Sequence, residues 1–170
     1  IGLEICRQLV AQGAKVILND VDESLAKKAA QSMTGNEDNC MPYPGDAADF
    51  NFIQKLVDDC INRHGKLDIV IANAGITLFG DFFEYKHDDF TKVMNLNLGG
   101  SFFLTQAASI RMKKNKTGGR ILLMSSVTGH QAHKNLAAYG MSKAALEMLA
   151  KTLVVELSPF QITINAIAPG

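Results

Sequence analysis

Short runs of β-branched and aliphatic residues alternate along this chain with longer segments of helical periodicity, and this alternation limits the folds open to it. A glycine, a proline or a residue that caps helices lies at most boundaries between the two patterns. The patterns predict strands at 14–19, 40–43, 67–72, 120–125 and 162–166. They predict helices at 1–12, 23–33, 49–64, 88–114 and 136–157. Such an order predicts an α/β fold, a doubly wound parallel sheet with right-handed crossovers.

Length and charge narrow the class of protein further. A chain of 170 residues is long enough for one domain with a substantial core and too short for two, so residues 1–170 are expected to form a single domain. The 17 basic and 17 acidic side chains balance, which predicts no general attraction to nucleic acid or to anionic membrane surfaces. No apolar run approaches the ~18 residues of a membrane-spanning helix. Glu4 and Arg7 within the first apolar pattern indicate an amphipathic helix and not a signal peptide.

The three cysteines, Cys6, Cys40 and Cys60, lie far apart and form no C-x-x-C pair. Their odd number and their positions inside regular elements favour buried thiols in a reducing compartment over a disulfide or a metal role. A cytoplasmic protein is therefore expected.

Polar and small residues follow the expected strands at the end where parallel sheets bind ligands. These residues are Asp20, Asp46, Asn73-Ala74-Gly75, Ser126 and Pro169-Gly170. Because the carboxyl ends of parallel strands meet at one edge, the sequence predicts a binding site there.

Tyr139 and Lys143 are the residues with the clearest chemistry. Four positions apart on a helix, they project from one face. The ammonium beside the phenol favours the phenolate, which suits proton transfer. Ser126, arriving from the end of another strand, would hold a substrate oxygen. Taken alone, the tyrosine–lysine pair also fits an ordinary solvated couple on a helix surface.

These residues together resemble the short-chain dehydrogenase/reductase family, and the resemblance covers essentially the whole chain. The family's motifs occur in order: Ile1-Gly2, Asp46-Ala47, Asn73-Ala74-Gly75, Asn97-Leu98-Gly99-Gly100, Ser126, Tyr139-x-x-x-Lys143 and Asn165 to Gly170. The resemblance implies a Rossmann-type domain in an NAD(P)-dependent oxidoreductase. Its reaction would move a hydride between a nicotinamide cofactor and a small alcohol or ketone.

The chain departs from the family pattern at both ends. It opens on Ile1-Gly2, the last residues of the family's glycine-rich turn, and stops at Pro169-Gly170, before the stretch that closes over the substrate. The first strand of the family would lie between the strands that end at Asp20 and Ala72, and without it both would expose an apolar edge. The 170 residues are therefore expected to be part of a longer chain, with the first strand and the C-terminal part missing.

The resemblance also implies the catalytic roles. Tyr139 would be the general acid or base, and Lys143 would favour its phenolate and bind the cofactor's ribose. Ser126 would hold and polarise the substrate oxygen, with Ser125 as the alternative. Asn97 would lie behind the lysine and organise a chain of water molecules; the alternative is that it only bonds a backbone carbonyl or marks a helix kink.

Cofactor binding is implied for Ile1, Gly2, Asp20, Asp46, Ala47, Asn73, Ala74, Gly75, Tyr139, Lys143, Pro169 and Gly170. Asp20 would accept hydrogen bonds from the adenosine ribose and repel a phosphate placed there. Because residues 19–22 contain no lysine or arginine, NAD is expected over NADP, although Asp20 also fits a simple helix cap. Asp46-Ala47 resembles the pair that holds adenine, and Ala74-Gly75 permits close approach of the cofactor.

Two further features bear on ligands and assembly. His130 and His133, between the serine and the tyrosine, fit solvated loop residues better than substrate contacts or a zinc pair, so no metal is expected. Apolar residues such as Met148 spread around much of the 136–157 helix, wider than one core stripe requires. With the family's habit of associating through this helix and the 88–114 helix, this predicts a homodimer or homotetramer.

Two other functions fit parts of the same pattern. An NADPH-dependent 3-oxoacyl reductase would share the catalytic residues, but Asp20 argues against it. A non-catalytic nucleotide-sensing or scaffold protein would keep the fold, but the presence of Asn97, Ser126, Tyr139 and Lys143 argues against lost chemistry.

Overall fold

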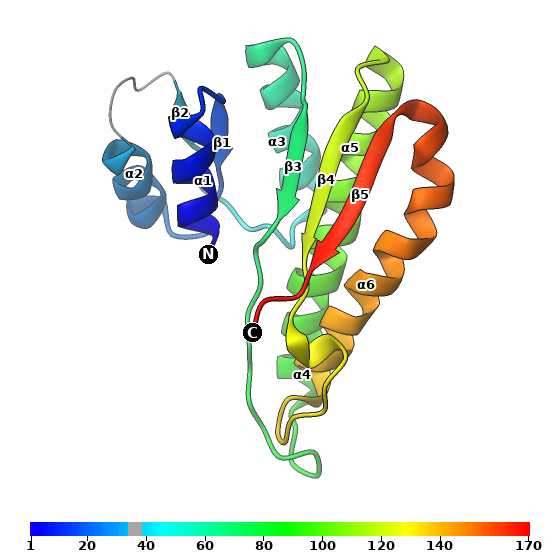
Figure 1. The fold of residues 1–170 in the computed structure, drawn as a ribbon. Coiled ribbons are helices and arrows are strands. Elements are labelled where there is room, and N and C mark those ends of the chain that lie inside the picture. The colour runs from blue at the N-terminus through cyan, green and yellow to red at the C-terminus, as the bar shows by residue number, and fades with distance from the viewer. Residues whose placement is uncertain (34–38) are drawn as a thin grey trace. The chain divides into compact units, whose positions relative to one another are not determined.

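The computed structural model describes residues 1–33 and 39–170 (Figure 1). They form two compact units, Ile1–Gly65 and Lys66–Gly170. Residues 34–38, between the expected helix 23–33 and the expected strand 40–43, lie outside the described residues. That the 170 residues form a single domain stays a prediction.

The described residues of the first unit form two parallel strands and three helices. Its elements are α1 (Gly2–Ala11), β1 (Val16–Leu18), α2 (Glu23–Ser32), β2 (Cys40–Pro42) and α3 (Phe50–His64). β1 pairs with β2 in register Val16 to Cys40, and its core contains Leu18, Ala26, Met33 and Cys40. Burial there raises the pKa of the Cys40 thiol to about 11, so this thiol stays protonated at neutral pH.

Local capping explains where the helices of this unit begin and end. The Asp22 carboxylate accepts hydrogen bonds from the backbone of Ser24 and Leu25 at the start of α2. Asp49 accepts from the backbone of Phe52 at the start of α3, which ends at Gly65 in the left-handed conformation. The residue that caps α2 is therefore Asp22, and the interpretation of Asp20 as the helix cap is wrong.

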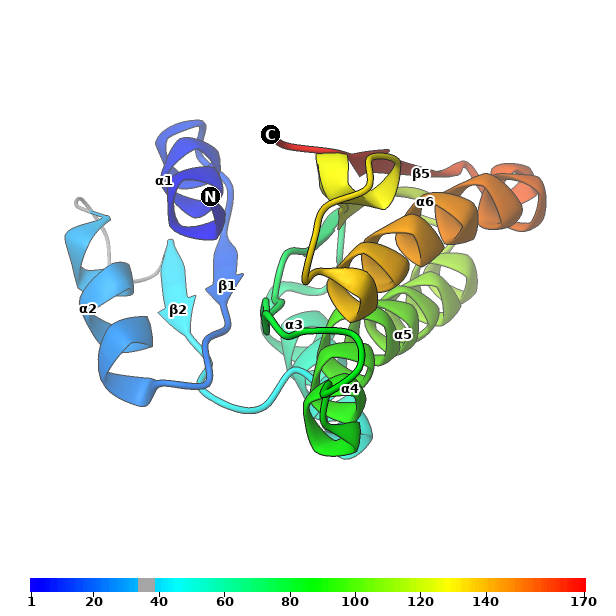
Figure 2. The same cartoon turned by 90° about the horizontal axis from the view of Figure 1, so that it is seen from below.

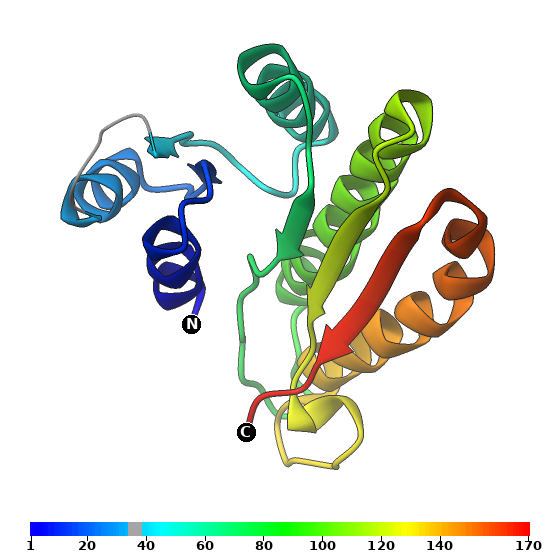
Figure 3. The same ribbon diagram turned by 45° about the horizontal axis from the view of Figure 1, so that its top comes forward.

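The second unit contains a three-stranded parallel sheet. Its strands are β3 (Ile69–Ala72), β4 (Gly119–Met124) and β5 (Ile162–Ile167), in the order β3-β4-β5. Ile69 pairs with Arg120, and Gly119 pairs with Ile162. Figure 3 shows the three strands side by side and pointing the same way. The parallel α/β architecture predicted from the alternation is thus present, although the described strands form two separate sheets.

Helices cover one face of the three-stranded sheet. They are α4 (His87–Val93), the π-helix η1 (Met94–Gly100), α5 (Ser101–Asn115) and α6 (Ala137–Leu157), with short 3₁₀ turns η2 (Val127–Gly129) and η3 (Ser158–Phe160). Figure 2 shows α5 and α6 on the same side of the sheet. The core between them includes Val70, Ala108, Ile121, Leu146 and Ile164.

The main correction to the expected elements concerns residues 88–114. One uninterrupted α-helix was expected, but the structure has seven residues of π-helix between α4 and α5. The strands also differ in length: β1 is shorter than 14–19 because its pairing with β2 spans three residues. None of the described helices has the length and apolar character needed to cross a membrane.

Candidate active site

Lys143 is a buried cation in the second turn of α6. Its side chain is 4% exposed, and the ammonium donates a hydrogen bond of 2.7 Å to the carbonyl of Met124 at the end of β4. The same nitrogen lies 5.4 Å from the centre of the Tyr139 ring. Burial holds the pKa of Lys143 below its usual value of 10.5. The helix therefore places the phenol and the ammonium together at the carboxyl end of the sheet, not on an open surface.

Asn97 lies at the centre of η1 and is completely buried. Its Oδ1 accepts a hydrogen bond of 2.8 Å from the backbone N–H of Ile76, and its Nδ2 donates to the carbonyl of the same residue at 3.0 Å. The second N–H donates to Ser142 Oγ at 3.1 Å. Asn97 thus bonds a backbone carbonyl and lies in an irregular stretch of helix. These are the two features that sequence reasoning offered as the alternative to a catalytic role. The water chain stays a prediction.

Ser142 extends this connection to the backbone of the tyrosine. It is fully buried, and its hydroxyl donates a hydrogen bond of 2.7 Å to the carbonyl of Tyr139. A continuous series of hydrogen bonds therefore runs from the loop after β3 through Asn97 to α6. Sequence reasoning missed Ser142, although its place between Tyr139 and Lys143 on the helix was a signal.

Gly75 packs closely against these residues. A Cβ atom added there would lie 3.0 Å from Asn97 Oδ1 and 3.5 Å from Lys143 Nζ. Gly75 and Ala74 are also exposed, whereas Asn73 is half-buried. The end of β3 therefore presents small residues to solvent, with Gly75 next to the buried ammonium; that they permit close approach of a cofactor stays a prediction.

The two adjacent serines differ in what they contact. Ser125 is buried, and its hydroxyl donates to the carbonyl of Lys143 at 3.0 Å and to Glu147 Oε1 at 2.8 Å. Ser126 is half-buried, and its Oγ accepts a hydrogen bond of 3.3 Å from the backbone of Thr128. The hydroxyl proton of Ser126 is thus left to donate to another group, which favours Ser126 over Ser125 as the substrate contact.

The last residues of the chain meet the loop that contains Ser126. The backbone N–H of Ser125 donates to the carbonyl of Ile167 at 2.7 Å, and that of Val127 donates to Pro169 at 3.0 Å. A Cβ on Gly170 would contact the Val127 side chain. The structure therefore brings Pro169 and Gly170 beside Ser126 at the carboxyl end of β4.

The residues expected near the adenosine half of a cofactor lie in the first unit. The Asn19 side chain donates to the carbonyls of Tyr43 at 3.0 Å and Gly45 at 2.9 Å. The Gly45 N–H donates to the Asp20 carbonyl at 3.0 Å. These bonds hold the end of β1 against the turn after β2. They bring together Asp20 and Asp46, which are exposed; Asn19 was missed because a polar residue at a strand end carries no distinctive pattern.

The carboxylates of both aspartates support local turns. Asp20 Oδ1 accepts from the backbone of Asp22 at 3.0 Å, and Asp46 Oδ1 accepts from that of Ala48 at 2.8 Å. Each keeps one carboxylate oxygen available to a ligand. Ala47 is half-buried, Ile1 is 72% exposed, and Gly2 begins α1.

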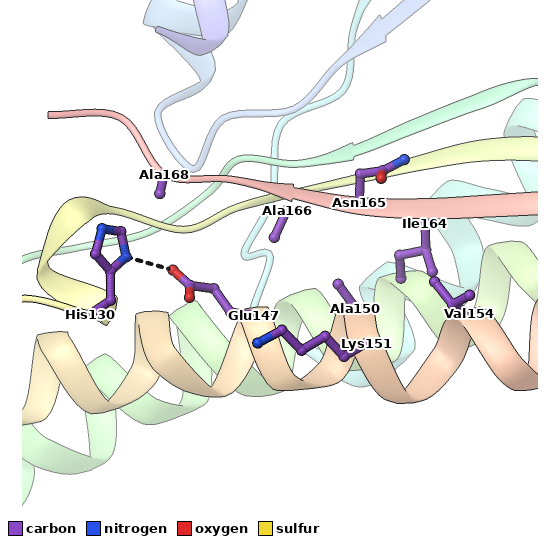
Figure 4. A pocket seen from close by; sticks show the side chains of 9 residues that line it. All are labelled: His130, Glu147, Ala150, Lys151, Val154, Ile164, Asn165, Ala166 and Ala168. Atoms are coloured by element: carbon purple, nitrogen blue, oxygen red, sulfur yellow. Dashed lines mark hydrogen bonds and ion pairs between the residues drawn. The ribbon is translucent and has the colours of Figure 1, made fainter.

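Glu147 is a third residue that sequence reasoning missed. Its Oε1 lies 3.4 Å from His130 Nδ1 in addition to the bond from Ser125 (Figure 4). The hydrogen bond from Ser125, followed by that with His130, holds the pKa of Glu147 below its usual value of 4.5. Its position four residues beyond Lys143 puts it on the same helix face, which was the available signal. His133 is exposed, and no group of metal-ligating side chains occurs among the described residues.

Comparison with known proteins decides the family. The family model described as short chain dehydrogenase matches residues 1–170. The chain belongs to this family. Oxidoreductase UcpA of Salmonella typhimurium is 36% identical over 171 residues, covering 100% of this chain and 64% of that protein. Versicolorin reductase stcU of Emericella nidulans is 34% identical, with the same two coverages, so the chain spans about 64% of these relatives.

Solved structures of the family agree with the fold. NAD+-bound xylitol dehydrogenase matches with a TM-score of 0.94 and 32% identity, covering 99% of this chain and 65% of that one. A short-chain dehydrogenase/reductase from Mycobacterium marinum matches with a TM-score of 0.90 and 27% identity, covering 100% and 66%. The expectation of an α/β domain of the short-chain dehydrogenase type is confirmed.

Proposed function

We propose that these residues form the cofactor-binding and catalytic part of an NAD-dependent oxidoreductase that interconverts a small alcohol and its ketone. The observation that carries this proposal is the buried Lys143 ammonium beside the Tyr139 ring, on a helix tied to Asn97. Burying a cation is costly, and titratable groups with perturbed pKa values gather at catalytic sites. Family membership supports the same reaction class.

The residues present fit a nicotinamide dinucleotide. The small, exposed Ala74 and Gly75 leave space above the ammonium that a side chain would fill. An ammonium has three N–H donors, and the bond to Met124 uses one, which leaves two for ribose hydroxyls. Asn73, Tyr139, Pro169 and Gly170 are proposed to bind the cofactor in the second unit. Ile1, Gly2, Asp20, Asp46 and Ala47 are proposed to bind it in the first.

The proposed mechanism assigns one task to each side chain. The Tyr139 hydroxyl gives a proton to the ketone oxygen in reduction, and the Tyr139 phenolate takes one from the alcohol in oxidation. Lys143 holds its positive charge beside the Tyr139 ring, and Ser126 donates a hydrogen bond to the oxygen where negative charge develops. Asn97 holds the loop after β3 and the helix in register. The bound nicotinamide supplies or accepts the hydride.

The cofactor preference follows from Asp20. Its exposed carboxylate at the end of β1 would accept bonds from ribose hydroxyls, and its charge would repel the additional phosphate of NADP. The NAD+-bound state of xylitol dehydrogenase, 32% identical, is in keeping with this preference.

The direct test is turnover by the full-length protein with NAD and NADP and a panel of secondary alcohols. We expect NAD to give the higher kcat/KM. Asp20→Ala should lower kcat/KM for NAD by roughly 10-fold or more, since each bond to a charged acceptor is worth about 1.5–3 kcal/mol. It should raise kcat/KM for NADP. A native preference for NADPH would instead support a 3-oxoacyl reductase, and cofactor binding without any turnover would support a nucleotide sensor.

A further inference from the structure

One carboxylate oxygen, Glu147 Oε1, contacts the chain on both sides of Ser126. It accepts a hydrogen bond from Ser125 Oγ at 2.8 Å and lies 3.4 Å from His130 Nδ1. Figure 4 shows the His130 and Glu147 side chains directed toward each other from the loop and from α6. A Cβ on Gly129 would lie 2.8 Å from the same oxygen, so the loop is packed against the carboxylate.

The placement of this oxygen connects it to the reacting groups. Ser125 directly precedes Ser126, and Gly129 and His130 end the turn that Ser126 begins. Glu147 follows Lys143 by four residues and Tyr139 by eight, so all three share one face of α6. The second acceptor of the Ser125 hydroxyl is the carbonyl of Lys143 itself, at 3.0 Å. We propose that Glu147 is a positioning residue that fixes the Ser126 hydroxyl relative to Tyr139 and Lys143; this inference rests on the proposed function.

The environment of Glu147 suits a lasting acceptor. The charged or titratable groups that face it are His130 on the loop and Lys151 on its own helix, and both favour the carboxylate. The Lys143 ammonium points instead to the carbonyl of Met124. A hollow of about 370 Å³ between α6 and β5 borders Glu147, whose side chain is 26% exposed. Water therefore reaches the Glu147 carboxylate. The carboxylate stays charged and still accepts the hydrogen bond from Ser125.

The experiment compares four variants of the full-length protein: Glu147→Ala, Glu147→Gln, Ser125→Ala and the double variant of Ser125→Ala with Glu147→Ala. Glu156→Ala is the matched control, because Glu156 is an exposed carboxylate on the same helix. Glu147→Ala should lower kcat by ~10- to 100-fold, since misplacing a reacting group by about 1 Å costs that order. The Kd for NAD should stay within about 2-fold of the unmodified value, because Ser126 contacts the substrate and not the cofactor.

Two comparisons separate positioning from general damage. Glu147→Gln retains an acceptor oxygen and should recover most of the lost kcat. The double variant should lose no more than the worse single variant, because both changes break the same hydrogen bond. If Glu147→Ala does not fold, Ser125→Ala alone must show the same fall in kcat. A Glu147→Ala variant as active as Glu156→Ala would overturn the inference.

Tyr139→Phe in the same assay separates this inference from the proposed function. An active Tyr139→Phe variant refutes the catalytic assignment, whereas an inactive one with an unaffected Glu147→Ala refutes the positioning role alone. Amide hydrogen exchange at residues 126–130 gives a readout that needs no turnover. Exchange should be faster in Glu147→Ala than in the unmodified protein and nearly normal in Glu147→Gln. Equal exchange in both variants and the unmodified protein contradicts the inference.

Discussion

At the scale of single residues, Lys143 shows most directly that the site is built at the expense of stability. Its ammonium is 4% exposed and has one backbone carbonyl as its hydrogen-bond partner among the described residues. A buried cation so sparsely paired is unfavourable unless a ligand or a reaction requires it. The lowered pKa of Lys143 expresses this cost, because burial disfavours the charged form.

This cost predicts a dependence of stability on pH. Between the lowered folded pKa of Lys143 and the usual 10.5, the unfolded chain binds more protons than the folded one, so the free energy of unfolding contributed by Lys143 rises with pH. Below the folded pKa its contribution is constant and unfavourable. The urea concentration at the midpoint of unfolding should therefore include a rise from Lys143 as the pH approaches 10.5, and Lys143→Met should remove that part of the rise. Lys151→Met, on the exposed side of α6, is the control. Equal slopes for Lys143→Met and the unmodified protein would contradict this prediction.

The tyrosine gives the second prediction at this scale. Tyr139→Phe removes the proton-transfer hydroxyl and little else, so kcat should fall by ~100- to 10,000-fold while NAD still binds. Tyr43→Phe is the control, because its hydroxyl contacts Lys55 and Asp59 on α3. The readout is steady-state turnover alongside the Kd for NAD. Retention of more than half of the normal kcat in Tyr139→Phe would show that another group transfers the proton.

At the scale of elements, the site is formed where a π-helix, a loop and a long α-helix meet. Asn97 is one of the seven residues of η1, and its side chain pairs with the backbone of Ile76 by accepting from its N–H and donating to its carbonyl. π-turns are rare in helices and occur frequently at functional sites. The loop after β3 also approaches this helix closely at Gly75, where an added Cβ would lie 3.0 Å from Asn97 Oδ1.

The closeness at Gly75 yields a matched pair of substitutions. Gly75→Ala places a methyl group 3.0 Å from Asn97 Oδ1, so the amide or the loop must shift, at a cost of about 1–3 kcal/mol. Activity should fall by roughly 10-fold or more because Asn97 and Lys143 lie on the other side of that contact. Gly99→Ala adds a methyl group 3.7 Å from the Met94 carbonyl, an ordinary contact, and should leave both quantities nearly unchanged. Thermal unfolding and kcat/KM measure the two effects; similar values for both variants would remove the special role of Gly75.

Much of this arrangement was predictable from the sequence. The order of strands and helices follows from apolar periodicity, and α6 begins and ends within one residue of the expected 136–157. A helix kink at Asn97 was one alternative offered by the sequence, but its partner was not predictable, because Asn97 bonds a backbone that lies 21 residues earlier in the chain and no local pattern encodes that partner. The spacing to Tyr139 favoured Ser126 over Ser125 as the substrate contact. The hydrogen-bond partners of Ser125, on α6, became visible only in the fold, where α6 lies beside β4.

At the scale of the whole molecule, apolar side chains remain exposed along the helices of the second unit. On α6, Met141 is 56% exposed, Met148 60% and Val155 76%; on α5, Ile110 is 50% exposed. Apolar surface gathered on helices is typical of subunit interfaces, and obligate ones bury it much as cores do. The homodimer or homotetramer predicted from the sequence is thus still the expectation for the full-length protein.

Assembly can be tested in solution. Light scattering of the full-length protein at micromolar concentration should give the mass of a dimer or tetramer. Met148→Glu should weaken association by a few kcal/mol, since it buries a charge in an apolar contact. Gln31→Glu, exposed on α2 in the first unit, should leave the mass unchanged. A monomer for the unmodified protein would refute the prediction.

The π-turn around Asn97 has a further consequence for the tolerance of this helix to changes in length. A π-helix accommodates one residue more per turn than the flanking α-helices, because its hydrogen bonds join residues five apart. Deleting one residue between Met94 and Gly100 would let the segment become a regular α-helix. The flanking helices would then keep nearly the same faces, since the wide turn takes up the extra residue, whereas the side chains within the segment would change direction. Asn97 would turn away from Ile76 and Ser142 even though every residue of the site was still in the sequence. The spacing along this segment is therefore as much a part of the site as the identity of its side chains.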